Sequence, residues 1–313
     1  MDPQFTELKK KSKSGELFES YASHMRYNLG THKKTRLKKA GLELSGSLLH
    51  DRIAKEHGEK LFKELHDYSK NRGKAADSRL RFMTVLHSVV EPEVATVEAA
   101  VEQFTATYKE ILGSLGLWSL GAIELEMVNF DILERISQAR NDEARKLNVL
   151  SNLSAYSDFR SKLKANDRKK TKVLVHCHVV VDLGEDFTIN EQLLRNLIID
   201  EPGWNRSVYQ VEIKGLFKNR KTSKNLKAIA AYVTKGGNES LRYNAGFGRD
   251  LAEDLEAKIW REGLGRSGRG GETIEDERGL TVGELRQLDA LYCWLMGRRS
   301  DGRGYVLSSG VGD

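Results

Sequence analysis

The sequence has few cysteines and no long uncharged apolar run, and each shortage excludes a class of protein. Its two cysteines, Cys177 and Cys293, are too far apart for a CxxC pair. A cysteine-based zinc site and a disulfide framework are therefore excluded, and a reducing compartment is expected. The most apolar stretch, residues 111–128, contains Glu124 and Glu126, so the chain lacks the run of about 18 uncharged apolar residues typical of a membrane span. The start, MDPQFTELKKKSK, lacks the apolar core of a signal peptide, and we expect a cytoplasmic protein.

Positive charge is in slight excess. The 313 residues include 51 lysines and arginines against 45 aspartates and glutamates, so the formal net charge is +6 and the pI is about 9.1. Hydrophobic residues make up 39% of the chain, which is enough to bury a core and excludes wholesale disorder. Residues 1–79 are rich in lysine and arginine and contain only a short helical run. We interpret them as a basic, partly helical N-terminal arm, with a merely solubilising surface as the alternative.

Residues 80–245 alternate between strand and helix patterns. The predicted strands are 82–89, 118–128, 172–181 and 207–215, and the predicted helices are 94–111, a second one that starts with the capping-box pair Thr188 and Glu191, and 223–235. A helical insertion is expected at about 130–171, and a helical C-terminal extension at 246–313. This order predicts an α+β fold, with a ferredoxin-like, or split βαβ, antiparallel sheet and helices on one face.

Two histidines interrupt the most apolar predicted strand. His176 and His178 are two residues apart in KVLVHCHVVV, so both side chains leave the same face of the sheet. Polar groups are costly to bury unless something binds them, which favours a metal-ligand or hydrogen-bond role. Glu124 and Glu126 share a face of the preceding strand and could add a carboxylate, with Glu126 as first choice. Satisfied core histidines and a solvated strand face are the alternatives.

Such a mixed imidazole and carboxylate site suits a particular group of metals. A site of this kind with open positions fits Mg²⁺ or Mn²⁺ as a cation that polarises a phosphate, and zinc also fits by ligand type. Cys177, between the two histidines, points to the opposite face and is expected only to pack.

Tyr232 and Lys235 lie three residues apart on one face of the predicted helix 223–235. A free tyrosine has a pKa of about 10, so a phenol that acts as a nucleophile at neutral pH needs a nearby cation, metal or base. Lys235 could supply part of that help. The alternative is an amphipathic helix with an ordinary packed tyrosine.

A basic run adjoins this helix. Residues 214–227, KGLFKNRKTSKNLK, contain six basic residues and no acid. A solvated loop usually mixes charges of both signs, so the run favours contact with nucleic-acid phosphates. The candidate contacts are Lys218, Arg220, Lys221 and Lys224.

Three motifs in their order resemble the HUH endonucleases, specifically the single-tyrosine rolling-circle replication initiators of the plasmid Rep type. They are GAIELEM at 121–127, VHCHVVVD at 175–182 and AIAAYVTKGG at 228–237. The resemblance covers about residues 81–237, roughly half of the chain. It implies an HUH nuclease core and site-specific, metal-dependent nicking and strand transfer on single-stranded DNA.

The resemblance also implies roles for individual residues. Tyr232 would form a covalent 5′-phosphotyrosine and leave a free 3′-hydroxyl. His176, His178 and Glu126 would hold the divalent metal, and Lys235 would steady the phosphate or the metal site. Expected partners are single-stranded DNA at an origin hairpin or nick site, duplex origin DNA, and a host helicase, since the chain has no GxxxxGK[ST] loop.

Departures from the family pattern narrow the subtype. Position 236 is glycine where the two-tyrosine subclass has a second tyrosine, and Tyr232 follows the histidine motif, which disfavours a conjugative relaxase. A single-tyrosine transposase is the nearest alternative. A non-catalytic single-stranded nucleic-acid-binding module shares the fold order, but such modules usually display aromatics on the sheet where His176 and His178 stand. A phosphoesterase of another HxH type would carry three alternating histidines or HxHxDH, and HCHVVVD has neither pattern.

Overall fold

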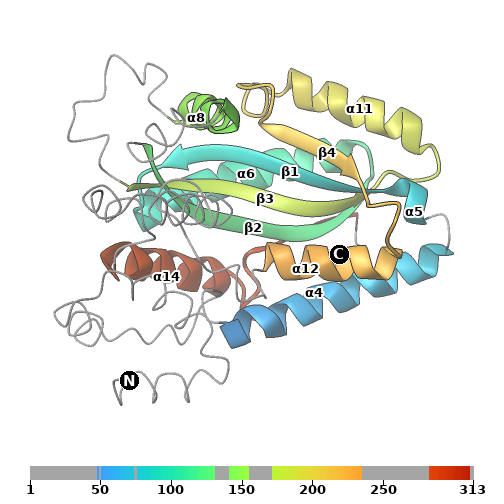
Figure 1. The fold of residues 1–313 in the computed structure, drawn as a ribbon, viewed down its shortest axis with the longest axis horizontal. Coiled ribbons are helices and arrows are strands. Elements are labelled where there is room, and N and C mark those ends of the chain that lie inside the picture. Colours follow the sequence, from blue (N-terminus) through green and yellow to red (C-terminus); the bar gives the residue numbers. More distant parts are fainter. Residues whose placement is uncertain are drawn as a thin grey trace, which may run out of the picture.

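The computed structural model describes residues 48, 51–73, 76–130, 141–154, 171–234 and 282–310 (Figure 1). Its strands are β1 (Leu80–Val90), β2 (Trp118–Asn129), β3 (Thr171–Asp182), β4 (Val211–Gly215) and β5 (Val306–Ser309). Its helices are α4 (Asp51–Arg72), α5 (Ala76–Arg79), α6 (Val94–Ser114), α8 (Asn141–Leu153), α11 (Phe187–Asp200), α12 (Thr222–Val233) and α14 (Val282–Gly297). The predicted α+β class is confirmed.

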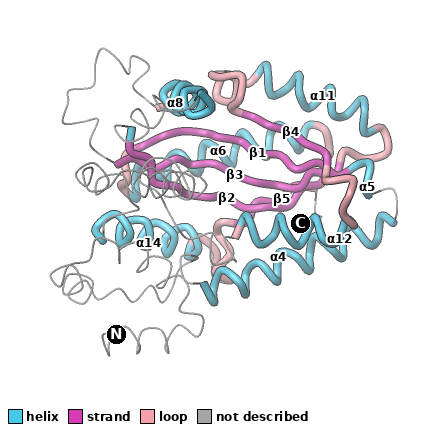
Figure 2. The backbone as a smooth tube through the Cα atoms, viewed as in Figure 1, coloured by secondary structure: helices cyan, strands magenta, loops and turns pink. Residues whose placement is uncertain are grey.

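All five strands belong to one sheet, in the order β4-β1-β3-β2-β5 (Figure 2). Every neighbouring pair of strands is antiparallel. The chain runs β1-α6-β2, then β3-α11-β4, and the sheet order of these four strands agrees with the split βαβ arrangement expected from the sequence. β3 lies at the centre, between β1 and β2. Every residue of β3 after Thr171 is buried, which explains its nearly continuous apolar sequence.

Helices α6 and α11 cover one face of the sheet. The sequence predicts an apolar stripe along α6, and the structure buries all of its members except the exposed Val94: Val94, Val97, Val101, Phe104, Tyr108 and Ile111. The Tyr108 hydroxyl hydrogen-bonds to Ser119 of β2, which ties the helix to the sheet.

Helices also cover the opposite face, so the expectation of helices on one face only is wrong. There α12 packs against β2 and β3, and α4 runs beside α12 (Figure 1). Tyr68 of α4 stacks on Trp118 of β2 and donates a hydrogen bond of 2.8 Å to Asp182 of β3. This face carries apolar side chains as well as the histidines, and burying them requires a second layer of helices. Thus α4, from the segment predicted to be an arm, shares the core of the sheet through the buried Leu61 and Leu65.

The insertion and the C-terminal segment each add to this body. Helix α8, in the predicted helical insertion, packs over the end of the histidine-bearing face in a separate apolar cluster with Val89, Val128 and Leu174. The C-terminal segment supplies α14, as predicted, and β5, which pairs with β2 and was not predicted. The four residues of β5 are too few to show the alternating pattern of a strand in the sequence.

The predicted capping box of the second helix does not form. Helix α11 begins at Phe187, and its N-cap Asp186 makes no capping hydrogen bond through its side chain. Glu191 instead pairs with Arg81 of β1 at 2.8 Å and with Arg195 at 2.7 Å. The carboxylate therefore fastens α11 to the sheet rather than capping the helix.

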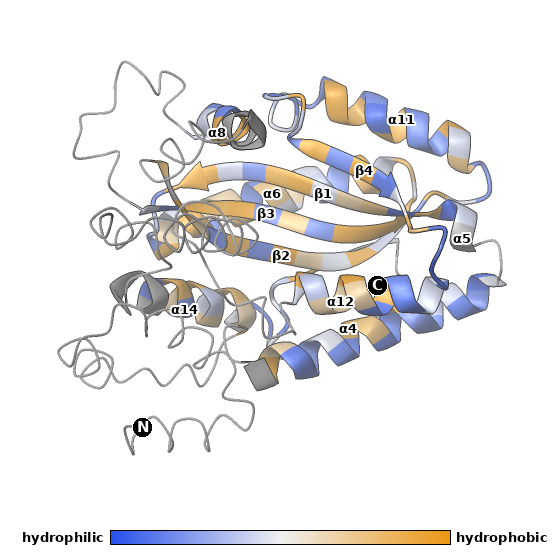
Figure 3. Cartoon of the chain, in the orientation of Figure 1, coloured by the Kyte–Doolittle hydropathy of each residue, from blue (hydrophilic) through white to orange (hydrophobic). Residues whose placement is uncertain are grey.

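Apolar residues are concentrated along the three central strands, and the helices expose their polar sides (Figure 3). Among the described helices, none has both the length and the apolar character required to cross a membrane.

Candidate active site

The two histidines of β3 lie side by side on the face covered by α12. Both are buried, and their ring centroids are 5.0 Å apart. The alternation of a strand puts Cys177 on the opposite face, where burial raises the pKa of its thiol. Cys177 is thus a packing residue, as the sequence indicated.

Glu124 completes a compact cluster with both histidines. β2 pairs with β3 so that Glu124 stands directly opposite His176. Its Oε2 lies 3.3 Å from Nε2 of His178 and 3.7 Å from Nε2 of His176. One ligand atom from each of the three residues lies within 4.8 Å of the others, so the buried group could hold a metal ion.

Glu126, the first choice from the sequence, takes a more peripheral place. Its Oε2 lies 3.7 Å from Nε2 of His176, and its cross-strand partner is Leu174 rather than a histidine. Glu124 is therefore the carboxylate near both imidazoles, and Glu126 is a further oxygen donor within reach of one. The sequence could not choose between them because the register of β2 against β3 is set across a long insertion, not by a tight hairpin.

A glycine allows the two strands to come together here. Gly121 of β2 lies beside the backbone of His178 and Val179, and a Cβ at this position would stand 2.1 Å from the carbonyl oxygen of His178. Any larger residue would have to push β2 away from β3. Gly121 thus fixes the spacing between the strand that carries the carboxylates and the strand that carries the histidines.

Burial keeps both imidazoles neutral. Burial lowers the pKa of His178 to about 4, against a smaller opposite effect from Glu126. The pKa of His176 is lowered well below its ordinary value by burial and by its neighbour His178. A neutral imidazole offers a nitrogen lone pair, and Nε2 of neither ring makes a hydrogen bond within the described residues. Two buried acceptor nitrogens facing a carboxylate fit a divalent cation, which could bind both imidazoles and the Glu124 carboxylate.

Two side chains from β1 orient His178, and the sequence did not reveal them. Thr84 stands opposite His178 and its Oγ1 lies 2.8 Å from Nδ1 of the ring, which leaves Nε2 directed at Glu124. Phe82 stacks on the same ring with centroids 5.5 Å apart. Hydrogen bonds to the second nitrogen of a histidine commonly fix the orientation of a metal ligand. Only the β1-β3 register places Thr84 here, and no local pattern encodes that register.

Tyr232 of α12 lies next to this cluster. Its ring meets that of His178 edge to face with centroids 4.9 Å apart, and it also contacts Phe82 at 6.5 Å. The tyrosine remains 46% exposed, whereas the histidines and Glu124 are buried. The apolar side of α12, with Leu226, Ala230 and Val233 buried, docks the helix and leaves Tyr232 at the boundary with solvent. The structure therefore brings together the tyrosine and the histidines that the sequence singled out from different segments.

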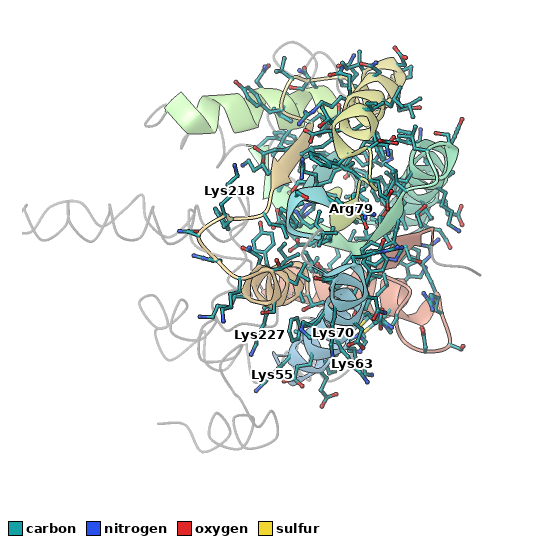
Figure 4. The ribbon with its side chains drawn as sticks, turned by 90° about the vertical axis from the view of Figure 1, so that its right-hand side faces the viewer. Lys55, Lys63, Lys70, Arg79, Lys218 and Lys227 are labelled. Atoms are coloured by element: carbon teal, nitrogen blue, oxygen red, sulfur yellow. The ribbon has the colours of Figure 1, made fainter. Side chains whose placement is uncertain are left out.

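The basic candidates lie at the other end of α12. Lys218, Arg220, Lys221 and Lys224 are all exposed, in the loop between β4 and α12 and in the first turn of that helix. Lys218 extends outward from this loop, and Lys227 from the helix (Figure 4). Lys235, the predicted helper of Tyr232, lies outside the described residues.

Comparison with known proteins gives no family for this chain. No protein-family model, no curated protein and no solved structure matches it.

Proposed function

We propose that this chain is a metal-dependent endonuclease and strand transferase of the HUH type, acting on single-stranded DNA with Tyr232 as its nucleophile. One observation carries the proposal: a half-exposed tyrosine lies in ring contact with His178, beside the buried group of Glu124, His176 and His178. A phenol at the edge of a potential cation site is suited to attack a phosphate that reaches it from solvent.

The proposed reaction exchanges one phosphodiester for another. The Tyr232 oxygen forms a bond to phosphorus while the bond from phosphorus to the 3′ oxygen breaks. The phenolic proton passes to solvent, which reaches the half-exposed ring, and the leaving oxygen takes up a proton as a free 3′-hydroxyl. The products are a 5′-phosphotyrosine and a 3′ end. Since the number of phosphodiester bonds is unchanged, a later 3′-hydroxyl can reverse the step and rejoin strands.

Glu124, His176 and His178 would hold the divalent cation, with Glu126 as a further ligand. When bound, Mg²⁺ or Mn²⁺ would polarise the phosphate as a Lewis acid. Thr84 and Phe82 keep the His178 ring in place, so the ligand set is oriented before any DNA arrives. In this proposal Lys235 would steady the phosphate, and Lys218, Arg220, Lys221 and Lys224 would contact the DNA backbone.

The biological role that fits this chemistry is initiation of rolling-circle replication of a plasmid or other mobile element. The 3′-hydroxyl would prime synthesis, and the protein would remain on the 5′ end until strand transfer. The expected partners are single-stranded DNA at an origin hairpin or nick site, duplex origin DNA, and a host helicase.

A cleavage assay tests the proposal. Labelled single-stranded oligonucleotides from the neighbourhood of the gene are incubated with Mn²⁺ and with wild type, Tyr232→Phe, or the control Tyr209→Phe, which alters an exposed tyrosine in the loop before β4. We expect wild type and the control to release an upstream fragment with a 3′-hydroxyl that a polymerase extends, and to keep the downstream fragment joined to the protein through its 5′ end on denaturing gels. Cleavage that persists in Tyr232→Phe, or a downstream fragment that is released with a free 5′ phosphate, would refute the assigned nucleophile.

A further inference from the structure

An aromatic side chain stands exposed in the middle of the basic loop. Phe217 lies two residues after the end of β4, and 67% of its surface is accessible. Exposing a large apolar ring to water is unfavourable, and a loop that only keeps the protein soluble gains nothing from it. The position of this ring among cations therefore calls for a functional explanation.

The loop holds Phe217 in a defined place. The Phe217 carbonyl oxygen accepts hydrogen bonds from the Arg220 amide at 3.2 Å and from Nδ2 of Asn225 at 3.0 Å. The same Nδ2 also contacts the carbonyl oxygen of Arg220 at 3.4 Å. Asn225 is buried in the first half of α12, so a fixed side chain clamps the turn from inside. A ring on such a turn is preorganised for a partner and loses little conformational entropy on binding.

The charge around the ring has one sign. Residues 213–234 contain no aspartate or glutamate, and Lys218, Arg220 and Lys221 follow Phe217 closely in the sequence. The Arg220 guanidinium lies over the ring, 5.1 Å from its centroid. An aromatic ring with cations beside it is the arrangement that binds bases by stacking and phosphates by charge.

The exposed side of α12 connects this loop to the nucleophile. Lys224, Lys227, Ala228 and Tyr232 are exposed and follow one another at helical spacing. The rise of a helix places Tyr232 about 15 Å from the first turn of α12. Lys227 points outward from the helix between the two ends (Figure 4). A strand bound at Phe217 could thus run along α12 toward Tyr232.

We propose that Phe217 is a base-stacking platform for single-stranded DNA, which contacts an unpaired base at a distance from the scission point set by the length of α12. This inference rests on the proposed function only in placing the scission point at Tyr232. Paired bases present no free face to the ring, so the platform selects unpaired DNA.

Binding measurements in the Tyr232→Phe background with EDTA test the platform without any cleavage. Fluorescence anisotropy compares single-stranded and duplex oligonucleotides on Phe217→Ala, Phe217→Trp and the control Tyr209→Ala, which removes an exposed aromatic from another loop. We expect Phe217→Ala to weaken single-strand binding about five- to a hundredfold. Phe217→Trp and the control should bind like the parent, and duplex binding should change little in all three.

Tryptophan fluorescence gives a second, direct measure of base stacking. The tryptophan of Phe217→Trp should lose fluorescence on adding single-stranded DNA, because a stacked base quenches the indole. Unchanged single-strand affinity in Phe217→Ala, or an equal loss for single strands and duplex, would overturn the stacking role.

The outcome separates the two proposals. Loss of binding in Phe217→Ala together with no cleavage by wild type supports the platform and refutes the nickase. Cleavage dependent on Tyr232 together with unchanged binding in Phe217→Ala supports the nickase and refutes the platform.

Discussion

The hydroxyl of Tyr292 makes two hydrogen bonds to the backbone of Leu125. It donates to the Leu125 carbonyl oxygen and accepts from the Leu125 amide, each at 3.0 Å. Leu125 lies between Glu124 and Glu126, beyond the part of β2 that pairs with β5. A side chain of α14 therefore takes the place of β5 as the hydrogen-bonding neighbour of β2 at this point, and it holds the backbone that carries both carboxylates.

Tyr292→Phe should loosen this part of the sheet edge. The change leaves the buried amide and carbonyl of Leu125 without their side-chain partner, at a cost of about 1–3 kcal/mol in the free energy of unfolding. We also expect Mn²⁺ affinity to fall about tenfold, as is typical when a group that orients metal ligands is lost. Calorimetric titration with Mn²⁺ measures the affinity. Tyr108→Phe is the matched control, because it removes a buried hydroxyl on the other face and should leave Mn²⁺ affinity unchanged.

Glu124 and Glu126 should differ in their contribution to metal binding. Glu124 lies near both histidines and Glu126 near one, so Glu124→Gln should reduce Mn²⁺ affinity by more than about a hundredfold and abolish cleavage. Glu126→Gln should weaken binding by about tenfold or less and leave measurable cleavage. Titration and cleavage on the two isosteric variants compare them directly. The reverse order would show that Glu126 is the principal ligand, as the sequence first suggested.

Acid should destabilise the fold partly through His87. This buried histidine of β1 contacts Phe104, and burial, helped by the charge of Arg206, lowers its pKa to about 4. In the unfolded chain its pKa is about 6.5, so as the pH falls from 6.5 to 4 the unfolded state binds a proton that the folded state does not. Folding stability therefore falls through this window, by about 3 kcal/mol at most from this group.

The replacement His87→Leu isolates that contribution. It removes the titrating group, so the difference in unfolding free energy between wild type and variant should shift in favour of the variant as the pH falls from 6.5 to 4. Urea denaturation at several pH values measures this shift. A difference that stays constant with pH would contradict the assignment.

The salt dependence of DNA binding should report the basic loop. The triple alanine replacement of Lys218, Arg220 and Lys221 should reduce the slope of log Kd against log salt by about 2, since each phosphate contact on a single strand contributes about 0.7. The control replaces Lys55, Lys63 and Lys70 on α4 (Figure 4), which removes the same charge elsewhere. Anisotropy titrations between low and moderate salt give both slopes. Equal slopes for the two triple variants would mean that binding depends on total charge and not on the loop.

The sequence predicted the elements whose patterns are local. The continuous apolar run of β3 and the helical stripe of α6 appear where expected, because burial on both faces or along one side leaves a periodic trace. His176 and His178 were recognisable because polar side chains inside such a run are anomalous. Tyr232 was singled out from its own segment, and the structure places it beside them.

The features that the sequence did not predict depend on contacts between distant segments. The register of β2 against β3 decides that Glu124, not Glu126, stands opposite His176, and no short turn sets that register. Thr84 reaches His178 only through the pairing of β1 with β3. Likewise, the packing of α4 on α12 and the pairing of β5 with β2 arise from tertiary burial, which no window of the sequence displays.

The residue that becomes joined to DNA is the most direct test of the central claim. Trypsin cuts after Lys227 and Lys235, so Tyr232 is the single tyrosine in the peptide AIAAYVTK. Wild type is incubated with Mn²⁺ and a single-stranded substrate, the DNA is trimmed by nuclease, and the peptides are sequenced by mass spectrometry. The account predicts a nucleotide phosphate on Tyr232 of this peptide. Cleavage with the adduct on another residue, or with no adduct at all, would contradict it.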